Sequence, residues 1–255
     1  MNADQHILHS EIGGTSVLEI DGRRRGLVLL CEHAGRDVPD AWNRLGLSEE
    51  YFSTHFSHDI GAADLTRALS THLDAPAFLA RYSRLFYDIN RALRSWDCIR
   101  PDMGGIPVPG NQNLTDAERD LRDTLVRKPF DRAVLRRARK GDVFVGIHSF
   151  SRVYDGWMRE TEIGVLRAEG CKHGQAMLDL LRADGRFVIG DNDPYDLRKV
   201  GPGTMSRLQA AIDAEAIILE VRNDIVDTPE GVAKVAACLG KAILALASPD
   251  EEVRP

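Results

Sequence analysis

The chain has 255 residues, of which 43% are hydrophobic and 28% are charged, and its formal net charge is −6. This negative charge argues against nucleic acid or an anionic membrane as the main partner, because both attract basic proteins. No apolar run approaches the roughly 20 residues of a membrane span, and the length suits one α/β domain, which we expect to cover residues 1–255.

The cysteines and the N-terminus indicate a cellular compartment. The four cysteines form no CxxC pair, and their wide spacing fits neither a zinc finger nor a disulfide framework. The first residues lack the basic region and apolar core of a signal peptide. We therefore expect a cytoplasmic protein with reduced thiols.

Strand and helix signals alternate along the first part of the chain. A short strand or turn at 16–22 leads into Leu27–Cys31, an apolar run that predicts a strand buried on both faces. Apolar residues at helical spacing follow in 48–73, with Ser48 as the expected N-cap. Two strand-like fragments come next, at 78–80 and 85–87.

A loop and a long helix are expected in the middle of the chain. Asp97–Asn113 is rich in Gly and Pro, and loops of this length inside domains are often functional. Thr115–Glu118 has the form of a capping box. It predicts a helix that runs to about Lys140.

The second half repeats the alternation of strands and helices. Four further apolar runs predict strands at 143–147, 162–166, 187–189 and 216–219. Helical patterns occupy 172–185, 204–213 and a last segment that begins at Thr228–Glu230 and ends near Ala247. This alternation predicts an α/β protein with a mixed or largely parallel sheet.

Three buried strands end in ionisable residues. The pair Glu32-His33 follows the first buried strand, His148 follows the strand at 143–147, and Glu220 follows the strand at 216–219. One such histidine alone is more often a hydrogen-bonded core residue. Two histidines and a carboxylate together are the usual protein ligands of a hydrolytic zinc, and a further carboxylate can act as general base.

A second cluster of polar residues spans residues 82–91. Arg84 and Arg91 carry planar guanidinium groups that bind carboxylates through two hydrogen bonds, and Asn90 can add another. The alternative interpretation is a surface network of ion pairs, which contributes little free energy. The apolar residues around the cluster favour partial burial.

Six motifs of the chain, in this order, resemble the N-formylglutamate amidohydrolase family over about residues 27–245. They read CEHAGRDVP, HDIGAADL, YSRLFYDINR, GIHSF, NDPY and ILEVRND. That family is related to the zinc carboxypeptidases and to aspartoacylase. The resemblance implies a three-layer α/β/α fold with a mixed central sheet, of the zinc-exopeptidase (phosphorylase/hydrolase-like) type.

The resemblance also implies a metal site with one zinc ion, or another divalent metal in its place. His33 matches the first zinc histidine and His148 the last. For the carboxylate ligand, the Asp of the HDIGA motif corresponds to Asp59, which we favour, and Glu32 is the second choice.

The remaining roles follow from the same resemblance. Glu220 matches the general base, Asn90 and Arg91 are expected to hold the substrate carboxylate, and Arg84 or Arg222 is expected near the scissile carbonyl. The chain departs from the family pattern after Thr204, where relatives usually carry a histidine and this chain reads MSRL. This departure concerns the identity of the substrate more than the hydrolytic machinery.

We therefore expect a zinc-dependent amidohydrolase that cleaves an N-acylated acidic amino acid such as N-formylglutamate, a small-molecule substrate. A non-catalytic relative that binds small carboxylated metabolites, or a peptidase that acts on short peptides, is the alternative.

Overall fold

In a computed structural model, described for residues 15–197, 199, 201 and 203–246, the chain folds around a seven-stranded sheet. Residues 1–14, on which the signal-peptide argument rests, lie outside this range. Across the sheet, the strands follow the order β1 (Val17–Ile20), β3 (Ala77–Ala80), β2 (Leu27–Cys31), β6 (Val143–Phe150), β11 (Glu215–Arg222), β9 (Ile163–Leu166) and β10 (Ile189–Asp191).

The central strands are parallel and the edges run the other way. Strands β3, β2, β6 and β11 are parallel to one another. Strand β1 is antiparallel to β3, and β9 is antiparallel to β11, whereas β10 is parallel to β9. The mixed central sheet that the sequence predicts is therefore confirmed.

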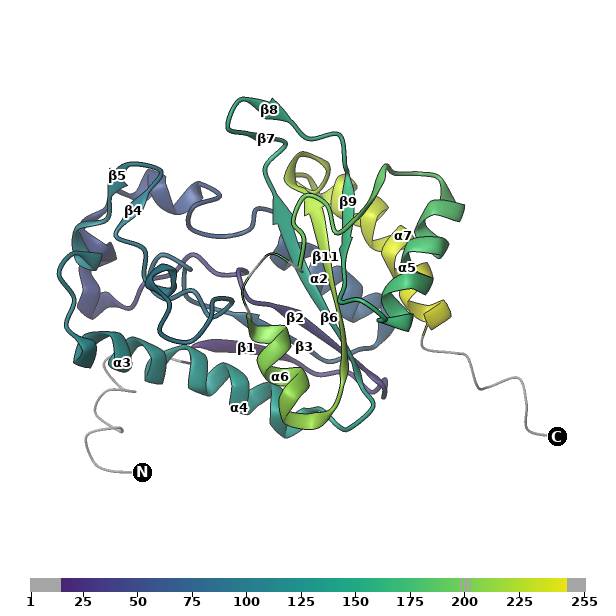
Figure 1. Ribbon diagram of the computed structural model, residues 1–255, viewed down its shortest axis with the longest axis horizontal. Helices are drawn as coiled ribbons and strands as arrows, with labels where there is room; N and C mark the ends of the chain where they lie inside the picture. The colour runs from purple at the N-terminus through teal and green to yellow at the C-terminus, as the bar shows by residue number, and fades with distance from the viewer. Residues whose placement is uncertain (1–14, 198, 200, 202, 247–255) are drawn as a thin grey trace.

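Helices cover both faces of this sheet (Figure 1). One face packs against α2 (Ala62–Leu73), α5 (Lys172–Asp184) and α7 (Pro229–Leu246). The other face packs against α3 (Asp116–Leu125), α4 (Arg127–Arg137) and α6 (Thr204–Ile212). This arrangement confirms the three-layer α/β/α architecture.

Alternation along the strands assigns side chains to the two faces. In β2, Val28 and Leu30 join the core under α4 and α6, whereas Leu29 and Cys31 join the core under α2 and α7. In β6 and β11, His148 and Glu220 are paired in register. They share the α6 face with Phe144 and Ile218 respectively, because residues two or four positions apart point to the same side of a sheet.

Short elements complete the fold. Two hairpins, β4–β5 (Asp102–Met103 and Ile106–Pro107) and β7–β8 (Val153–Tyr154 and Trp157–Met158), project from the sheet layer (Figure 1). Short 3₁₀ segments occupy η1 (Asp40–Gly46), which is interrupted by a kink, η2 (Glu49–Ser53), η3 (Trp96–Cys98), η4 (Pro109–Asn111) and η5 (Asn223–Ile225). No helix within the described ranges is long and apolar enough to cross a membrane.

The expected helix over 48–73 is shorter than predicted. Ser48 precedes only the turn η2, and α2 begins after Gly61, whose φ is 79°. Gly61 is required there because a Cβ would lie 2.2 Å from the carbonyl oxygen of Val226. The close contact between Gly61 and Val226 explains why α2 begins at Ala62 and not earlier.

The fragment 85–87 is a turn rather than a strand. The Ser83 hydroxyl accepts a hydrogen bond from the backbone N–H of Leu85 at 3.1 Å, and the Ser83 carbonyl accepts from Phe86 at 2.9 Å. Such local bonds compete with strand pairing. The turn leaves Arg84 and Asp88 on the same side as the strand ends described below.

The helix expected over 115–140 begins as predicted but is broken. Thr115 and Glu118 form a reciprocal capping box. The chain then divides into α3 and α4 at Val126. Pro129 explains the break, because its ring would clash with the carbonyl of Leu125 in a continuous helix. The strand predicted at 187–189 lies slightly later, at Ile189–Asp191.

Candidate active site

Ionisable side chains gather where the parallel central strands end. His33 lies two residues beyond β2, His148 lies near the end of β6, and Glu220 lies near the end of β11. Asp59 comes from the turn before α2, and Arg84 comes from the turn after β3. The carboxyl ends of parallel strands are the usual ligand sites of open α/β sheets.

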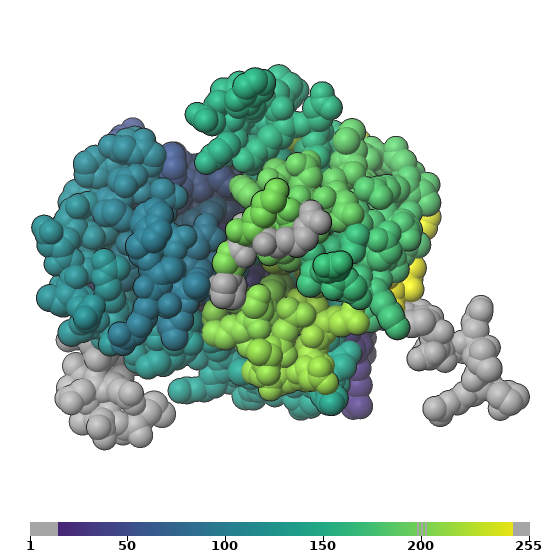
Figure 2. Space-filling model, viewed as in Figure 1, coloured from purple at the N-terminus to yellow at the C-terminus, as the bar shows by residue number. Residues whose placement is uncertain are grey.

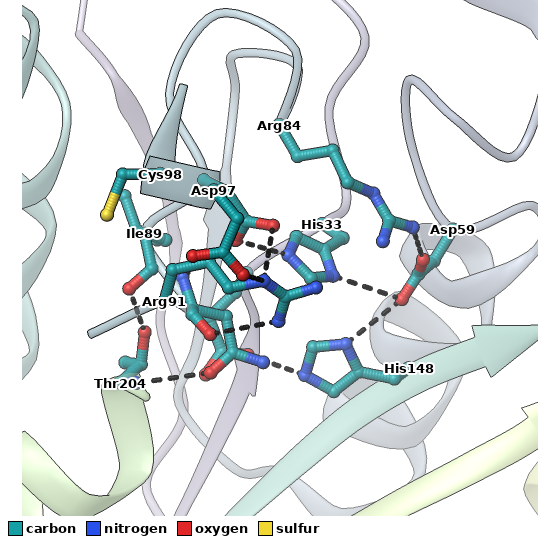
Figure 3. Close-up of polar contacts among 12 residues, drawn as sticks. His33, Asp59, Arg84, Ile89, Arg91, Asp97, Cys98, His148 and Thr204 are labelled. Carbon is teal, nitrogen blue, oxygen red and sulfur yellow. Dashed lines mark hydrogen bonds and ion pairs between the residues drawn. The ribbon is translucent and has the colours of Figure 1, made fainter. Parts of the chain in front are cut away.

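His33, Asp59 and His148 form a buried triad (Figure 3). Asp59 Oδ2 lies 3.0 Å from Nδ1 of His148 and 3.5 Å from Nδ1 of His33. One ligand atom from each residue can be chosen so that all lie within 4.8 Å of one another. The triad therefore directs two imidazoles and a carboxylate at one point.

A carboxylate stands behind each histidine of the triad. Nε2 of His33 lies 2.8 Å from Oδ1 of Asp88, and Nε2 of His148 lies 3.1 Å from Oε2 of Glu32. Carboxylates in this position fix the tautomer and orientation of metal-ligating histidines. The structure thus brings Asp59 to the Nδ1 atoms of both rings, and it places Glu32 beyond the His148 ring.

The charges at the triad depend on one another. Burial alone would raise the pKa of Asp59, but the Arg84 guanidinium and His33 have the larger, opposite effect. The pKa of Asp59 therefore lies well below its usual range. Burial lowers the pKa of His148, but Glu32 and Asp59 raise it to well above the ordinary value. Without a metal, the protonated imidazole of His148 therefore balances the negative charge of the buried carboxylates Asp59 and Glu32.

The donor set fits a divalent metal. Two imidazoles and one carboxylate are the ligands of many hydrolytic zinc sites, which keep a further position for water. Three carboxylates surround the two rings, and a bound cation would offset their buried negative charge. His33, Asp59 and His148 are the residues that would hold it.

Glu220 faces the same cavity as the triad. Its Oε2 atom is buried and has no hydrogen-bond partner among the described residues. Burial raises the pKa of Glu220 to about 8. A buried carboxyl group whose pKa lies near neutrality can both accept and donate a proton at physiological pH.

Arg84, Asn90 and Arg91 line the cavity as well, and they hold its parts together. Arg84 forms an ion pair with Asp59 through Oδ1. Oδ1 of Asn90 accepts a hydrogen bond from the backbone of Thr204 at 3.1 Å, which ties the turn to the start of α6. Nε of Arg91 lies 3.0 Å from Oδ2 of Asp97 (Figure 3).

Arg222 does not line this cavity. Its guanidinium donates to the backbone carbonyls of Arg159 at 3.3 Å and Glu160 at 3.2 Å, and it pairs with Asp224 at 2.7 Å. Arg159 in turn stacks over the ring of Tyr195, at 5.4 Å from the centroid. Arg222 therefore braces the segment that supports Tyr195, a residue of the cavity wall.

The cavity has a volume of about 810 Å³. Figure 2 shows the surface hollowed between the blue-to-teal residues on the left and the green residues in the centre. Its polar end holds the triad, Glu220 and the two arginines, and its other walls come from β9, β11, α6 and the loops that carry Asp97, Glu169 and Tyr195.

Three residues at the site were not among the site residues predicted from the sequence. Asp88 orients His33, and Tyr195 and His55 line the cavity. Burial lowers the pKa of His55 to about 4, so its ring is neutral at physiological pH. Asp88 and Tyr195 do lie inside the recognised motifs YSRLFYDINR and NDPY, which is the signal that could have found them.

Comparisons with known proteins agree with this geometry. The family model described as N-formylglutamate amidohydrolase matches residues 25–226. A solved gene product from Agrobacterium tumefaciens is 32% identical, with a TM-score of 0.81 over 91% of this chain and 96% of that chain. An N-formylglutamate amidohydrolase from Ralstonia eutropha is 17% identical, with a TM-score of 0.64 over 91% of this chain and 97% of that chain. No curated protein matches the sequence.

Proposed function

The chain belongs to the N-formylglutamate amidohydrolase family, and we propose that it is a metal-dependent amidohydrolase. The substrate of this proposal is a small N-acylated amino acid, with an acidic one such as N-formylglutamate as the reference. The observation that carries it is one cavity that holds both the His33–Asp59–His148 triad and the unpartnered carboxyl group of Glu220.

The reaction divides between the metal and the chain. A zinc ion or another divalent metal at the triad would polarise the amide carbonyl and lower the pKa of a water molecule. Glu220 accepts the proton of the attacking water on its carboxylate and delivers it to the nitrogen of the leaving amine. Its burial keeps bulk water from competing for that proton.

The arginines and the asparagine position the substrate in this proposal. Arg91 and Asn90 hold the carboxylate of the amino acid, and Arg84 faces the scissile carbonyl from beside Asp59. Fixing both ends of the substrate adds to the rate as well as to affinity. Arg222 acts at a distance, by bracing the segment behind Tyr195.

The proposal includes a cytoplasmic location and a small-molecule partner, with neither nucleic acid nor membrane. The four cysteines (Cys31, Cys98, Cys171 and Cys238) are all free thiols, which supports a reducing compartment.

Hydrolysis of N-formyl-L-glutamate by the purified protein tests the proposal. We expect release of free glutamate, measured with an amine-reactive dye. We also expect the rate to fall to background after treatment with a chelator and to recover when zinc is added, because the triad holds the metal. A rate that survives complete metal removal would contradict the proposal.

Replacing Glu32 by Gln tests the carboxylate behind His148. We expect metal affinity to fall by about 10–100-fold, the usual effect of losing such an orienting carboxylate. Zinc titration against a competing chelator measures this affinity. Glu32→Asp, which keeps the charge, is expected to recover part of it. A loss of thermal stability with unchanged zinc affinity would contradict the orienting role.

A further inference from the structure

We propose that the cavity has an apolar arm that binds a hydrocarbon group of several carbons beside the scissile amide. The inference rests on the proposed amidohydrolase function and narrows its substrate. It predicts that the preferred substrate is an N-acyl amino acid with an apolar group much larger than a formyl group, either as its acyl chain or as its side chain.

The first argument is size. The cavity measures about 810 Å³. Cavities of roughly 300–1,000 Å³ hold drug-sized ligands and bury most of their surface. N-formylglutamate is much smaller than such a ligand, so it would occupy the polar end and leave the rest of the cavity to water.

The second argument is the chemistry of the walls. The floor consists of Leu166 from β9 with Ala216 and Ile218 from β11, and Met205 from α6 borders it. Ala216, Ile218 and Met205 are largely buried, with 8%, 7% and 5% of their surface exposed, and each of them lines the cavity. Apolar surface left open beside a catalytic group gains free energy when an apolar ligand covers it.

The arm begins at the proposed catalytic base. Ala216 and Ile218 lie on the same face of β11 as Glu220, four and two positions before it. At about 3.3 Å per residue, the strand carries this surface roughly 13 Å away from Glu220. A chain of several carbons attached near the scissile amide can therefore lie along it.

Helix α6 is held firmly over this surface. Arg207 forms two hydrogen bonds with Asp131 of α4, at 2.8 and 2.9 Å, and the backbone of Thr204 is bonded to Asn90. Gly146 of β6 lets Met205 lie close to the sheet, because a Cβ there would stand 2.5 Å from the Met205 methyl. Met205 is thus packed on the sheet and forms a fixed side wall of the arm.

The distribution of charge favours an uncharged group in the arm. Among the described residues that line the cavity, the permanent cations are Arg84 and Arg91, both at the polar end. Arg84 is already paired with Asp59. The residues of α6 that face the cavity beside Met205 are Ser206 and Gln209, which are uncharged. A second carboxylate therefore gains no ion pair from the described residues that line the arm.

Four substrates test the inference on the zinc-loaded protein: N-formyl-L-glutamate, N-hexanoyl-L-glutamate, N-formyl-L-leucine and N-hexanoyl-L-leucine. We expect at least one apolar substrate to exceed N-formyl-L-glutamate in kcat/KM by about 10-fold or more, the effect of a few buried carbons. A preference for the hexanoyl glutamate assigns the arm to the acyl chain. A preference for formyl leucine assigns it to the side chain.

Two variants change the width of the arm in opposite directions. Ala216→Leu is expected to narrow it and to lower the apolar-to-formylglutamate ratio of kcat/KM by about 10-fold. Met205→Ala is expected to widen it and to favour the bulkier substrates. A variant that merely folds poorly lowers all four rates together and leaves the ratio unchanged, so the ratio is the readout.

The inference is overturned if N-formyl-L-glutamate is the best of the four substrates, or if neither variant shifts the ratio. Failure of the proposed function gives a different result, because no amide is then cleaved by the zinc-loaded protein. That outcome overturns the inference along with the function on which it rests.

Discussion

Glu220→Gln is expected to lower kcat by about 10²–10⁴-fold, the usual contribution of a general acid–base group. The substitution keeps the size and shape of the side chain but removes the carboxylate that accepts the proton. Zinc binding should stay at the wild-type level, because Glu220 lies outside the triad of closely spaced ligand atoms. Steady-state kinetics and metal analysis of the same preparation measure both properties.

The pH dependence of this variant adds a second readout to the same prediction. Burial raises the pKa of Glu220 to about 8 in the metal-free protein, and a nearby divalent cation would lower it. Only the ionised form accepts a proton, so wild-type kcat/KM should rise with pH through the pKa of Glu220, below pH 8. This acidic limb should be absent from Glu220→Gln. A variant with wild-type turnover would show that another group is the base.

His148→Ala is expected to abolish metal binding and to lower kcat/KM by about 10⁴-fold or more, out of the 10⁶-fold or greater acceleration that enzymes provide. His148 supplies one of the three ligand atoms of the triad, and its ring also separates two buried carboxylates, Asp59 and Glu32. Removing the ring therefore removes one metal ligand and leaves the negative charges of Asp59 and Glu32 without the imidazole between them.

A matched control separates this effect from the loss of any histidine. His173, on α5, pairs with Glu215 of β11 at 2.7 Å, and neither residue lines the cavity. His173→Ala is expected to keep both zinc and activity. A His148→Ala protein that binds zinc with wild-type affinity would contradict the metal site, whatever its activity.

The fold was largely predictable because buried strands carry a simple signal. Leu27–Cys31 is apolar at every position, and the structure buries all five residues under helices on both faces. The turn at 83–87 was not predictable from apolar content, because a hydroxyl group of Ser83 forms it. Pro129 could have predicted the break between α3 and α4, but the capping box and helical spacing concealed it.

The candidate site was predictable in its strand-end residues and less so in its loops. His33, His148 and Glu220 follow apolar runs whose ends meet at one edge of a parallel sheet, so their convergence follows from topology. Asp59 came from the family resemblance, because nothing in its local sequence marks a buried ligand. The position of Glu32 behind His148 depends on how two neighbouring elements face each other.

Arginines were the hardest side chains to assign. Arg84 and Arg91 reach the cavity, whereas Arg222 turns to the carbonyls of residues 159 and 160. A long flexible side chain can choose among several partners, and its choice depends on loops that carry no periodic signal. The apolar arm under α6 was likewise hidden, because Met205 and Ile218 look like ordinary core residues in the sequence.

The metal content of the purified protein tests the central claim most directly. After dialysis against metal-free buffer, elemental analysis should find about one divalent metal per chain in the wild type and in Glu220→Gln, and none in His148→Ala, because the triad offers a single three-ligand site. A wild-type protein that contains no metal and takes up none from added zinc would contradict the account. It would favour a module that binds carboxylated metabolites without cleaving them.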